Sequence, residues 1–339
     1  MIDPDRLSDL RIAKLRTLAS LNWTVPAGAT ATSFPAGATL FDPATARLWV
    51  LVDENADRRL GGVLAVARRA EATEIQVISD DVDGAGVMAR RAEQFRDDVH
   101  VWTLVDGALQ PVPPAPTAQD RAPAPEAEVC RSILVDGGLE VVVEGGNLTG
   151  EILGLEVARV VVDDAGAHVE AGVGRFDREA GDLIRGDMPA AASVERVAEL
   201  VRPMRRPGAE RHPLNQMVPE RWLRAILIAR PELVGAASLR PVGSARPRKN
   251  LLEDGVATAV GTGLDGAPVV MVCSTGVYLD AVPSAADDHQ THGPDARLVM
   301  VVPERDDVPV TQALVERMRH PAEVVTVPDD WRNLTAESD

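Results

Sequence analysis

Aromatic residues, lysine and cysteine are all scarce in this chain. Only 3% of the 339 residues are Phe, Trp or Tyr, and a single one is Tyr. Aliphatic side chains must therefore form most of any core, with the five Trp as large anchors. The two cysteines, Cys130 and Cys273, both lie in apolar settings, which favours buried thiols over a disulfide.

Long apolar runs are also missing. No stretch approaches the roughly 20 apolar residues of a membrane span, and the N-terminal residues contain no apolar run of signal-peptide length. These absences predict a soluble cytoplasmic protein without a membrane partner. The formal net charge of −17 favours solubility and repels polyanions at long range, so a general nucleic-acid coat protein is excluded.

The length and the 45% hydrophobic content predict two domains with buried cores. Residues 111–128 are rich in Pro and Ala, which is typical of an extended linker. We therefore expect an N-terminal domain over 1–110 and a C-terminal domain over 129–339.

The N-terminal domain alternates apolar strands with amphipathic helices, which predicts a three-layer βαβαβ arrangement of the α/β class. The expected helices are 6–21, 57–71 and 84–97, and the expected strands are 48–52, 74–79 and 99–105.

The C-terminal domain begins differently. Residues 132–174 contain apolar segments separated by Gly-containing turns, which predicts several strands in an antiparallel meander. The chain then returns to α/β order, so the whole domain is expected to be mixed α+β with a βαβ end. The expected helices here are 194–203, 219–229 and 311–319, and the expected strands are 268–274, 298–304 and 322–328.

Two acidic residues of the meander suggest catalysis. Glu156 lies in GEILGLEVARVVV and Glu170 lies one strand later in HVEAGVG. This hairpin of acids followed by a helix resembles the PD-(D/E)XK nuclease core over residues 132–180. The resemblance implies that Glu156 and Glu170 hold Mg²⁺ or Mn²⁺. The family's lysine position holds Gly172 instead, with Arg175 or Arg178 nearby. The alternative is that both acids line the exposed face of a half-buried sheet.

A second cluster has the composition of a metal site. Asp287, His289 and His292 lie within six residues and could bind a divalent ion such as zinc. Flanking Pro and Gly predict a loop, on which ligand geometry is not held by a helix. A solvated polar loop is the alternative.

Charge is strongly segregated along the chain. Residues 202–249 contain eleven basic and only three acidic residues, a local net charge of +8. Such a tract can bind phosphates, nucleic acid or an acidic protein partner, or it can neutralise the protein's own acids. The residues expected to bind an anion or partner are Arg202, Arg205, Arg206, Arg211, Arg246 and Arg248.

Two classes of function follow. In the first, the protein is a non-catalytic interaction or regulatory protein whose Arg-rich tract contacts a partner. In the second, it is a metal-dependent nuclease or phosphodiesterase that uses Glu156 and Glu170. The chain has 33 Arg and only 2 Lys, and as a whole it resembles a conserved actinobacterial protein family. That resemblance implies no site and no activity.

Overall fold

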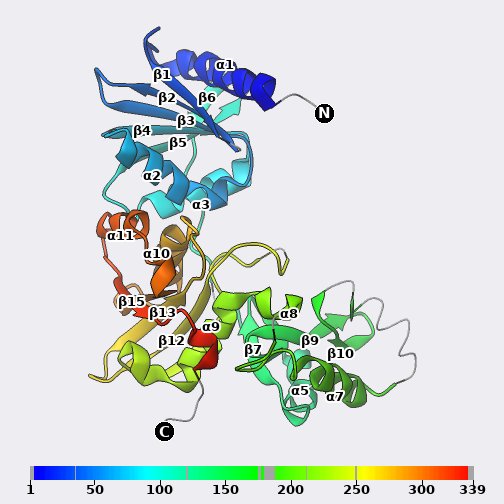
Figure 1. Ribbon diagram of the computed structural model, residues 1–339. Coiled ribbons are helices and arrows are strands. Elements are labelled where there is room, and N and C mark those ends of the chain that lie inside the picture. The colour runs from blue at the N-terminus through cyan, green and yellow to red at the C-terminus, as the bar shows by residue number, and fades with distance from the viewer. Residues whose placement is uncertain are drawn as a thin grey trace. The chain divides into compact units, whose positions relative to one another are not determined.

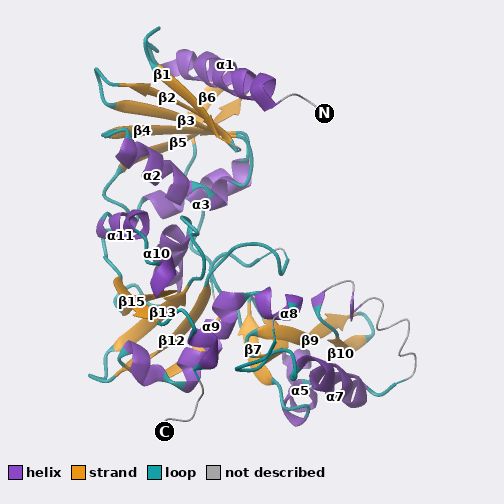
Figure 2. Ribbon diagram, viewed as in Figure 1, coloured by secondary structure: helices purple, strands orange, loops and turns teal. Residues whose placement is uncertain are grey.

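The computed structural model describes residues 4–34, 36–119, 121–174, 177–178, 188–210, 212–248 and 250–334. These residues form an α/β protein with three sheets (Figures 1 and 2). The chain divides into two compact units. The first unit contains Met1–Thr117, Leu279–Asp287 and Pro309–Pro321, and the second contains the remaining residues.

The first unit is built on a six-stranded sheet in the order β1-β2-β3-β4-β5-β6. Helix α1 covers one face of this sheet, and α2 and α3 cover the other (Figure 1). The elements are α1 (Pro4–Asn22), β1 (Thr30–Phe34), β2 (Gly37–Asp42), β3 (Arg47–Val52), α2 (Leu60–Arg69), β4 (Glu74–Ser79), α3 (Val82–Ala92), β5 (Asp98–Val105) and β6 (Ala108–Pro111).

The predicted βαβαβ order is present in this sheet. Strands β3, β4 and β5 are parallel neighbours, because the crossover helices α2 and α3 connect each of these strands to the next. The core under α1 contains Leu15, Leu40 and Trp49, all fully buried. Strands β1, β2 and β6 were not expected, because their Gly, Ala and Pro residues have weak strand propensity. They form by antiparallel pairing with the sheet.

The segment before helix α10 (Ala281–His292) belongs to the first unit and carries a buried acid. The Asp280 carboxylate accepts a hydrogen bond from the Gly61 backbone N–H at 3.1 Å. Gly61 is required here, since a Cβ would lie 2.2 Å from the Leu279 carbonyl oxygen. Burial raises the pKa of Asp280 to about 6, against the opposing effects of the Gly61 hydrogen bond and Arg91.

This pKa predicts a pH-dependent stability. Between about pH 4 and 6 the folded chain keeps a proton on Asp280 that the unfolded chain releases, so rising pH destabilises the fold. As the pH rises across this range, we expect the free energy of unfolding of Asp280→Asn to increase relative to that of the native chain by about 1.4 kcal/mol per pH unit. Urea unfolding of both chains at several pH values measures this difference. A difference that does not change with pH would contradict the raised pKa.

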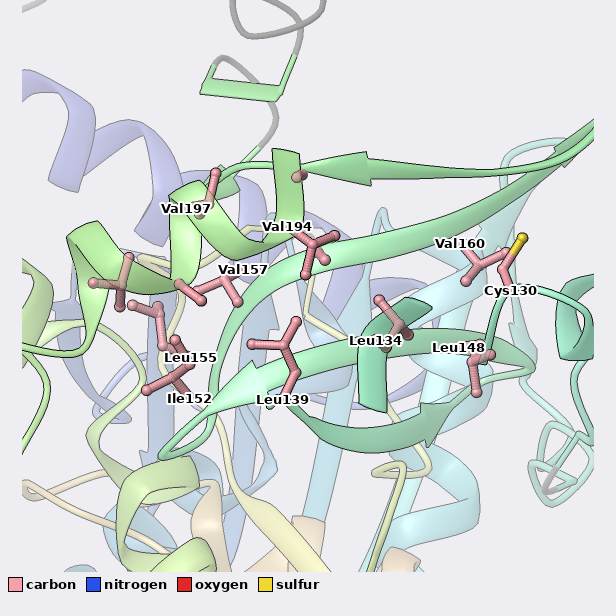
Figure 3. Packing of buried hydrophobic residues seen from close by; sticks show 14 of the residues in the cluster. Cys130, Leu134, Leu139, Leu148, Ile152, Leu155, Val157, Val160, Val194 and Val197 are labelled. Atoms are coloured by element: carbon pink, nitrogen blue, oxygen red, sulfur yellow. The ribbon is translucent and has the colours of Figure 1, made fainter. Parts of the chain in front are cut away.

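The second unit begins with a four-stranded antiparallel sheet in the order β10-β9-β8-β7. Its strands are β7 (Glu140–Glu144), β8 (Asn147–Ile152), β9 (Leu155–Asp163) and β10 (Gly166–Ala171), and its helices include α4 (Pro125–Glu128), α5 (Arg131–Asp136) and α7 (Ala190–Val201). Apolar residues of α5, α7 and one sheet face pack together (Figure 3). This sheet is the predicted antiparallel meander.

A five-stranded mixed sheet follows in the order β11-β12-β13-β14-β15. Its strands are β11 (Ala236–Val242), β12 (Ala257–Gly263), β13 (Pro268–Cys273), β14 (Arg297–Pro303) and β15 (Glu323–Val327), and helices α8 (Pro213–Gln216) and α9 (Pro219–Ala229) belong to the same unit. Helix α11 (Pro309–Glu316) belongs to the first unit. Strands β13, β14 and β15 are parallel. Helix α9 packs Trp222 and Leu223 into the core of this sheet. Cys130 and Cys273 are buried free thiols, as expected.

Two expectations about local structure are wrong. Residues 131–136 form helix α5 and not a strand, because a short apolar run does not distinguish a buried helix from a strand. Residues 287–292 belong to helix α10 and not to a loop. Within the described part of the chain, no helix has the length and apolarity needed to cross a membrane.

Candidate functional site

A β-bulge decides which face of the meander carries Glu156. In the pairing of β8 with β9, Glu151 lies opposite Glu156 and Gly150 lies opposite Ala158, so Val157 is an extra residue. Because the bulge shifts the alternation by one residue, Glu156 shares a face with Arg159. Arg159 is paired with Glu170 on β10. The two acids predicted to be catalytic therefore lie on one sheet face.

Guanidinium groups occupy the space that a metal ion would need between these acids. Arg178 places Nη1 3.0 Å from Glu156 Oε1 and Nε 3.6 Å from Glu170 Oε2. Arg159 donates two further hydrogen bonds of 2.9 Å to the Glu156 carboxylate. Arginine is always protonated, so it neutralises the acids without acting as a tuned base. Arg175 lies outside the described residues.

The same sheet face carries a second, more deeply buried charge cluster. Arg221 and Arg224 of helix α9 each bind both Glu144 and Glu151 of the meander. Arg221 Nη1 lies 3.1 Å from Glu151 Oε1, and Arg224 Nη2 lies 3.2 Å from Glu151 Oε2. Burial acts to raise the pKa of Glu144, but attraction to the two arginines outweighs it and lowers that pKa. These four residues hold helix α9 to the meander.

Gly154 allows the backbone of helix α9 to pack closely against this face of the sheet. Its φ of +76° favours glycine, and a Cβ would lie 2.3 Å from the Arg221 carbonyl carbon. We expect Gly154→Ala to lower the free energy of unfolding by at least about 2 kcal/mol. Gly266 has a similar φ of +83° in open space, so Gly266→Ala is the control that isolates the backbone cost. If urea unfolding shows equal losses of stability for Gly154→Ala and Gly266→Ala, the close approach of the Arg221 backbone does not explain the cost at Gly154.

Most members of the Arg-rich tract have internal partners. Arg205 is buried and donates to the carbonyl oxygens of Leu153, Leu214 and Met217, the last two at 2.7 and 2.8 Å. Its guanidinium lies 4.7 Å from the Trp222 ring centre, and burial lowers its pKa to about 9. These contacts give Arg205 a structural role.

The other predicted anion-binding residues do not form one free patch. Arg202 donates to the carbonyl oxygens of Gly137 and Gly138, and Arg206 donates to that of Pro203. Arg248 pairs with the buried Glu220, and Arg246 is partly buried. Arg211 and Lys249 lie outside the described residues. Internal neutralisation, the alternative to an external partner, thus accounts for much of the tract.

The predicted metal ligands are separated by the helix that contains them. Residues two apart on a helix point about 200° apart, so Asp287 and His289 face different sides. Asp287 accepts hydrogen bonds from Arg90 at 2.8 and 2.9 Å and from Arg91 at 3.0 Å. His289 and His292 hydrogen-bond the carbonyl oxygens of Ala296 and Gly243. No set of three or more metal-binding side chains comes together in the described ranges.

A groove in the second unit combines apolar walls with two arginines. Strands β7 and β11 border this cavity of about 370 Å³. Its lining residues are Arg121, Ala122, Val141, Val143, Arg240, Pro241 and Val242. Arg121 and Arg240 are exposed, and neither has an ion pair or side-chain hydrogen bond with any described residue. We refer to this feature as the β7–β11 groove.

The β7–β11 groove was not predicted from the sequence. Arg121 lies in the expected linker, outside the basic tract. Arg240 lies inside that tract, and no local sequence feature distinguishes it from the other arginines there. A second hollow of about 290 Å³ also contains Arg121, together with Ser244 and His292. Only the tertiary structure brings Arg121 near Arg240.

Comparisons with protein-family models, with curated proteins and with solved structures give no match to this chain.

Proposed function

We propose that this protein is a non-catalytic interaction protein that binds an anionic partner through the β7–β11 groove. The observation that carries the proposal is the pair Arg121 and Arg240, two exposed cations without partners among the described residues, at the edges of an apolar cavity. Elsewhere in the tract, the described arginines mostly contact carboxylates or carbonyl oxygens. The groove is therefore the part of the basic surface that is available to a partner.

The charge of the whole chain makes this location selective. A net charge of −17 repels anions in general, so an anion must gain specific contacts to bind. Arginine forms bidentate hydrogen bonds with carboxylates and phosphates, and the valine side chains add apolar contact. An anionic partner with apolar neighbours satisfies both features of the groove.

The proposal is tested by fluorescence anisotropy with a labelled short peptide in which Glu and Val alternate. We expect the double variant R121Q/R240Q to weaken binding at least about tenfold, equivalent to about 1.4 kcal/mol. The variant R68Q/R69Q removes the same charge from exposed positions on α2 and should leave binding unchanged. Equal binding by all three proteins, or no binding by the native chain, would reject the proposal.

The metal-dependent nuclease is the second candidate, because the bulge places Glu156 and Glu170 on one face. Incubation of the protein with Mn²⁺ and a labelled single-stranded oligonucleotide distinguishes the nuclease from the non-catalytic interaction protein. We expect no cleavage, since Arg178 lies between the acids. Cleavage that disappears in Glu156→Gln would instead support the nuclease.

A further inference from the structure

We propose that the second hollow, of about 290 Å³, is a binding site for a small phosphate monoester. It is lined by the Gly145 turn, residues 243–247, residues 118–121 and the end of helix α10, all of which belong to the second unit. We refer to it as the His292 hollow. This inference does not depend on the proposed function, because Arg240 and the valines of the β7–β11 groove do not line this hollow.

The polar side chains that line the His292 hollow are cationic or neutral. Arg121 and His292 can carry positive charge, and Gln119, Ser244 and Thr291 are neutral donors and acceptors. Among the described lining residues none is Asp or Glu, although the formal net charge of the chain is −17. The hollow is therefore suited to an anion, whose repulsion by the rest of the acidic protein must be offset by local contacts.

A buried acid of helix α10 holds one wall of the hollow in place. Asp288 is completely buried and accepts hydrogen bonds from the Ser244 hydroxyl at 3.0 Å and the Ala245 backbone N–H at 2.6 Å. The Thr258 hydroxyl also donates to this carboxylate. Because these donors engage the charge of Asp288, the wall that they form is fixed without presenting a free carboxylate to a ligand.

His292 lies one turn after Asp288 on the same helix, and its hydrogen bond determines which ring nitrogen remains available. A carbonyl oxygen can only accept, so Nε2 carries a hydrogen and donates to the Gly243 oxygen at 2.7 Å. Nδ1 has no hydrogen-bond partner in the part of the chain that the structure describes. When Nδ1 takes up a proton, it becomes a donor and the ring becomes positive, which a bound anion favours.

Arg121 supplies a permanent positive charge from another segment of the chain. Its side chain is exposed and has no ion pair or hydrogen bond with any described residue, so the guanidinium is free to turn into the hollow and bind two oxygens of one phosphate. A phosphate monoester carries nearly two negative charges near neutral pH. Arg121 and protonated His292 together match that charge, whereas a carboxylate is neutralised by Arg121 alone.

The size of the hollow indicates that the ligand has an organic group as well as a phosphate. A volume of about 290 Å³ is near the lower end of the range for small-molecule sites, and a phosphate group fills only part of it. Ala118, Ala245 and Pro247 add apolar surface to the lining. A small phosphorylated organic molecule therefore satisfies the charge, the donors and the apolar surface.

Isothermal titration calorimetry with phenyl phosphate at mildly acidic pH and constant ionic strength tests this site. We expect the native chain to bind phenyl phosphate at least about tenfold more tightly than benzoate, which has the same ring and a carboxylate. The variants R121Q and H292Q should each weaken phenyl phosphate binding at least about tenfold. Gln at position 292 keeps a donor for the Gly243 carbonyl oxygen and cannot become charged, and circular dichroism establishes that each variant is folded.

The variant R240Q is the matched control, because Arg240 lines the β7–β11 groove and not the His292 hollow. We expect R240Q to bind phenyl phosphate as the native chain does, and H292Q to bind the alternating Glu/Val peptide as the native chain does. If the native chain binds no phenyl phosphate, or if H292Q binds it unchanged, the inference is overturned and the proposed function is unaffected. Weaker phenyl phosphate binding by R240Q would place the anion in the groove and also overturn the inference. If phenyl phosphate binds as expected but the peptide does not, the proposed function fails and the His292 hollow is supported.

Discussion

Replacing Asp287 by Ala is expected to lower the free energy of unfolding of the first unit by about 3–5 kcal/mol. The Asp287 side chain is 1% exposed and binds both Arg90 and Arg91, whose side chains are 10% and 1% exposed. The variant leaves two buried guanidinium groups without their shared carboxylate, and burial of an unpaired charge is strongly unfavourable.

Native-state hydrogen exchange of the β3 amides measures this loss, because that strand lies in the core of the first unit. Asp295 is exposed, so Asp295→Ala removes an acid of the same kind as the control. Asp287→Asn keeps the shape and should lie between the native chain and the Ala variant. A loss below about 1 kcal/mol in Asp287→Ala, the range of a surface ion pair, would contradict the buried geometry.

The second large effect is expected at the cluster that joins α9 to the meander. Glu151→Ala removes one of the two carboxylates that Arg224 binds. The side chains of Arg224 and Glu151 are at most 2% exposed. We expect a loss of about 3–5 kcal/mol in the free energy of unfolding. Exchange of the β8 and β12 amides reports this change in the second unit.

A double replacement tests the electrostatic explanation of that loss. Replacement of both members of a buried pair by apolar residues often costs little, because no unpaired charge remains. The variant E151M/R224M should therefore lose less stability than Glu151→Ala alone, and Arg221 can still bind Glu144. If E151M/R224M loses as much stability as E151M and R224M lose separately when added together, the residues act independently and the cluster explanation is wrong.

Local sequence patterns were sufficient for most strands and for several helices. The apolar run at 48–52 forms β3, and the run at 74–79 forms β4 with the same bounds. Helix α9 coincides with the predicted 219–229, because Pro219 begins it and the apolar spacing is helical. The run at 133–135 was misassigned because it is too short to show a period.

The side-chain partners could not be predicted in the same way. Whether Glu156 shares a face with Glu170 depends on the bulge at Val157, and no local signal in the sequence marks that bulge. The arginines Arg221 and Arg224 were recognised as basic but not as the partners of Glu144 and Glu151. Those acids lie about 70 to 80 residues earlier in the chain.

The sequence by itself determined the α/β class, the segments that form most of the strands and the segregation of positive charge into residues 202–249. Those properties follow from local hydrophobic period and composition. Only the tertiary structure decided which positive charges have partners inside the protein and which are available to an external partner. A buried guanidinium is stable only beside its acceptors, so folding pairs Arg205, Arg221, Arg224 and Arg248 internally and leaves Arg121 and Arg240 beside the edge of β7.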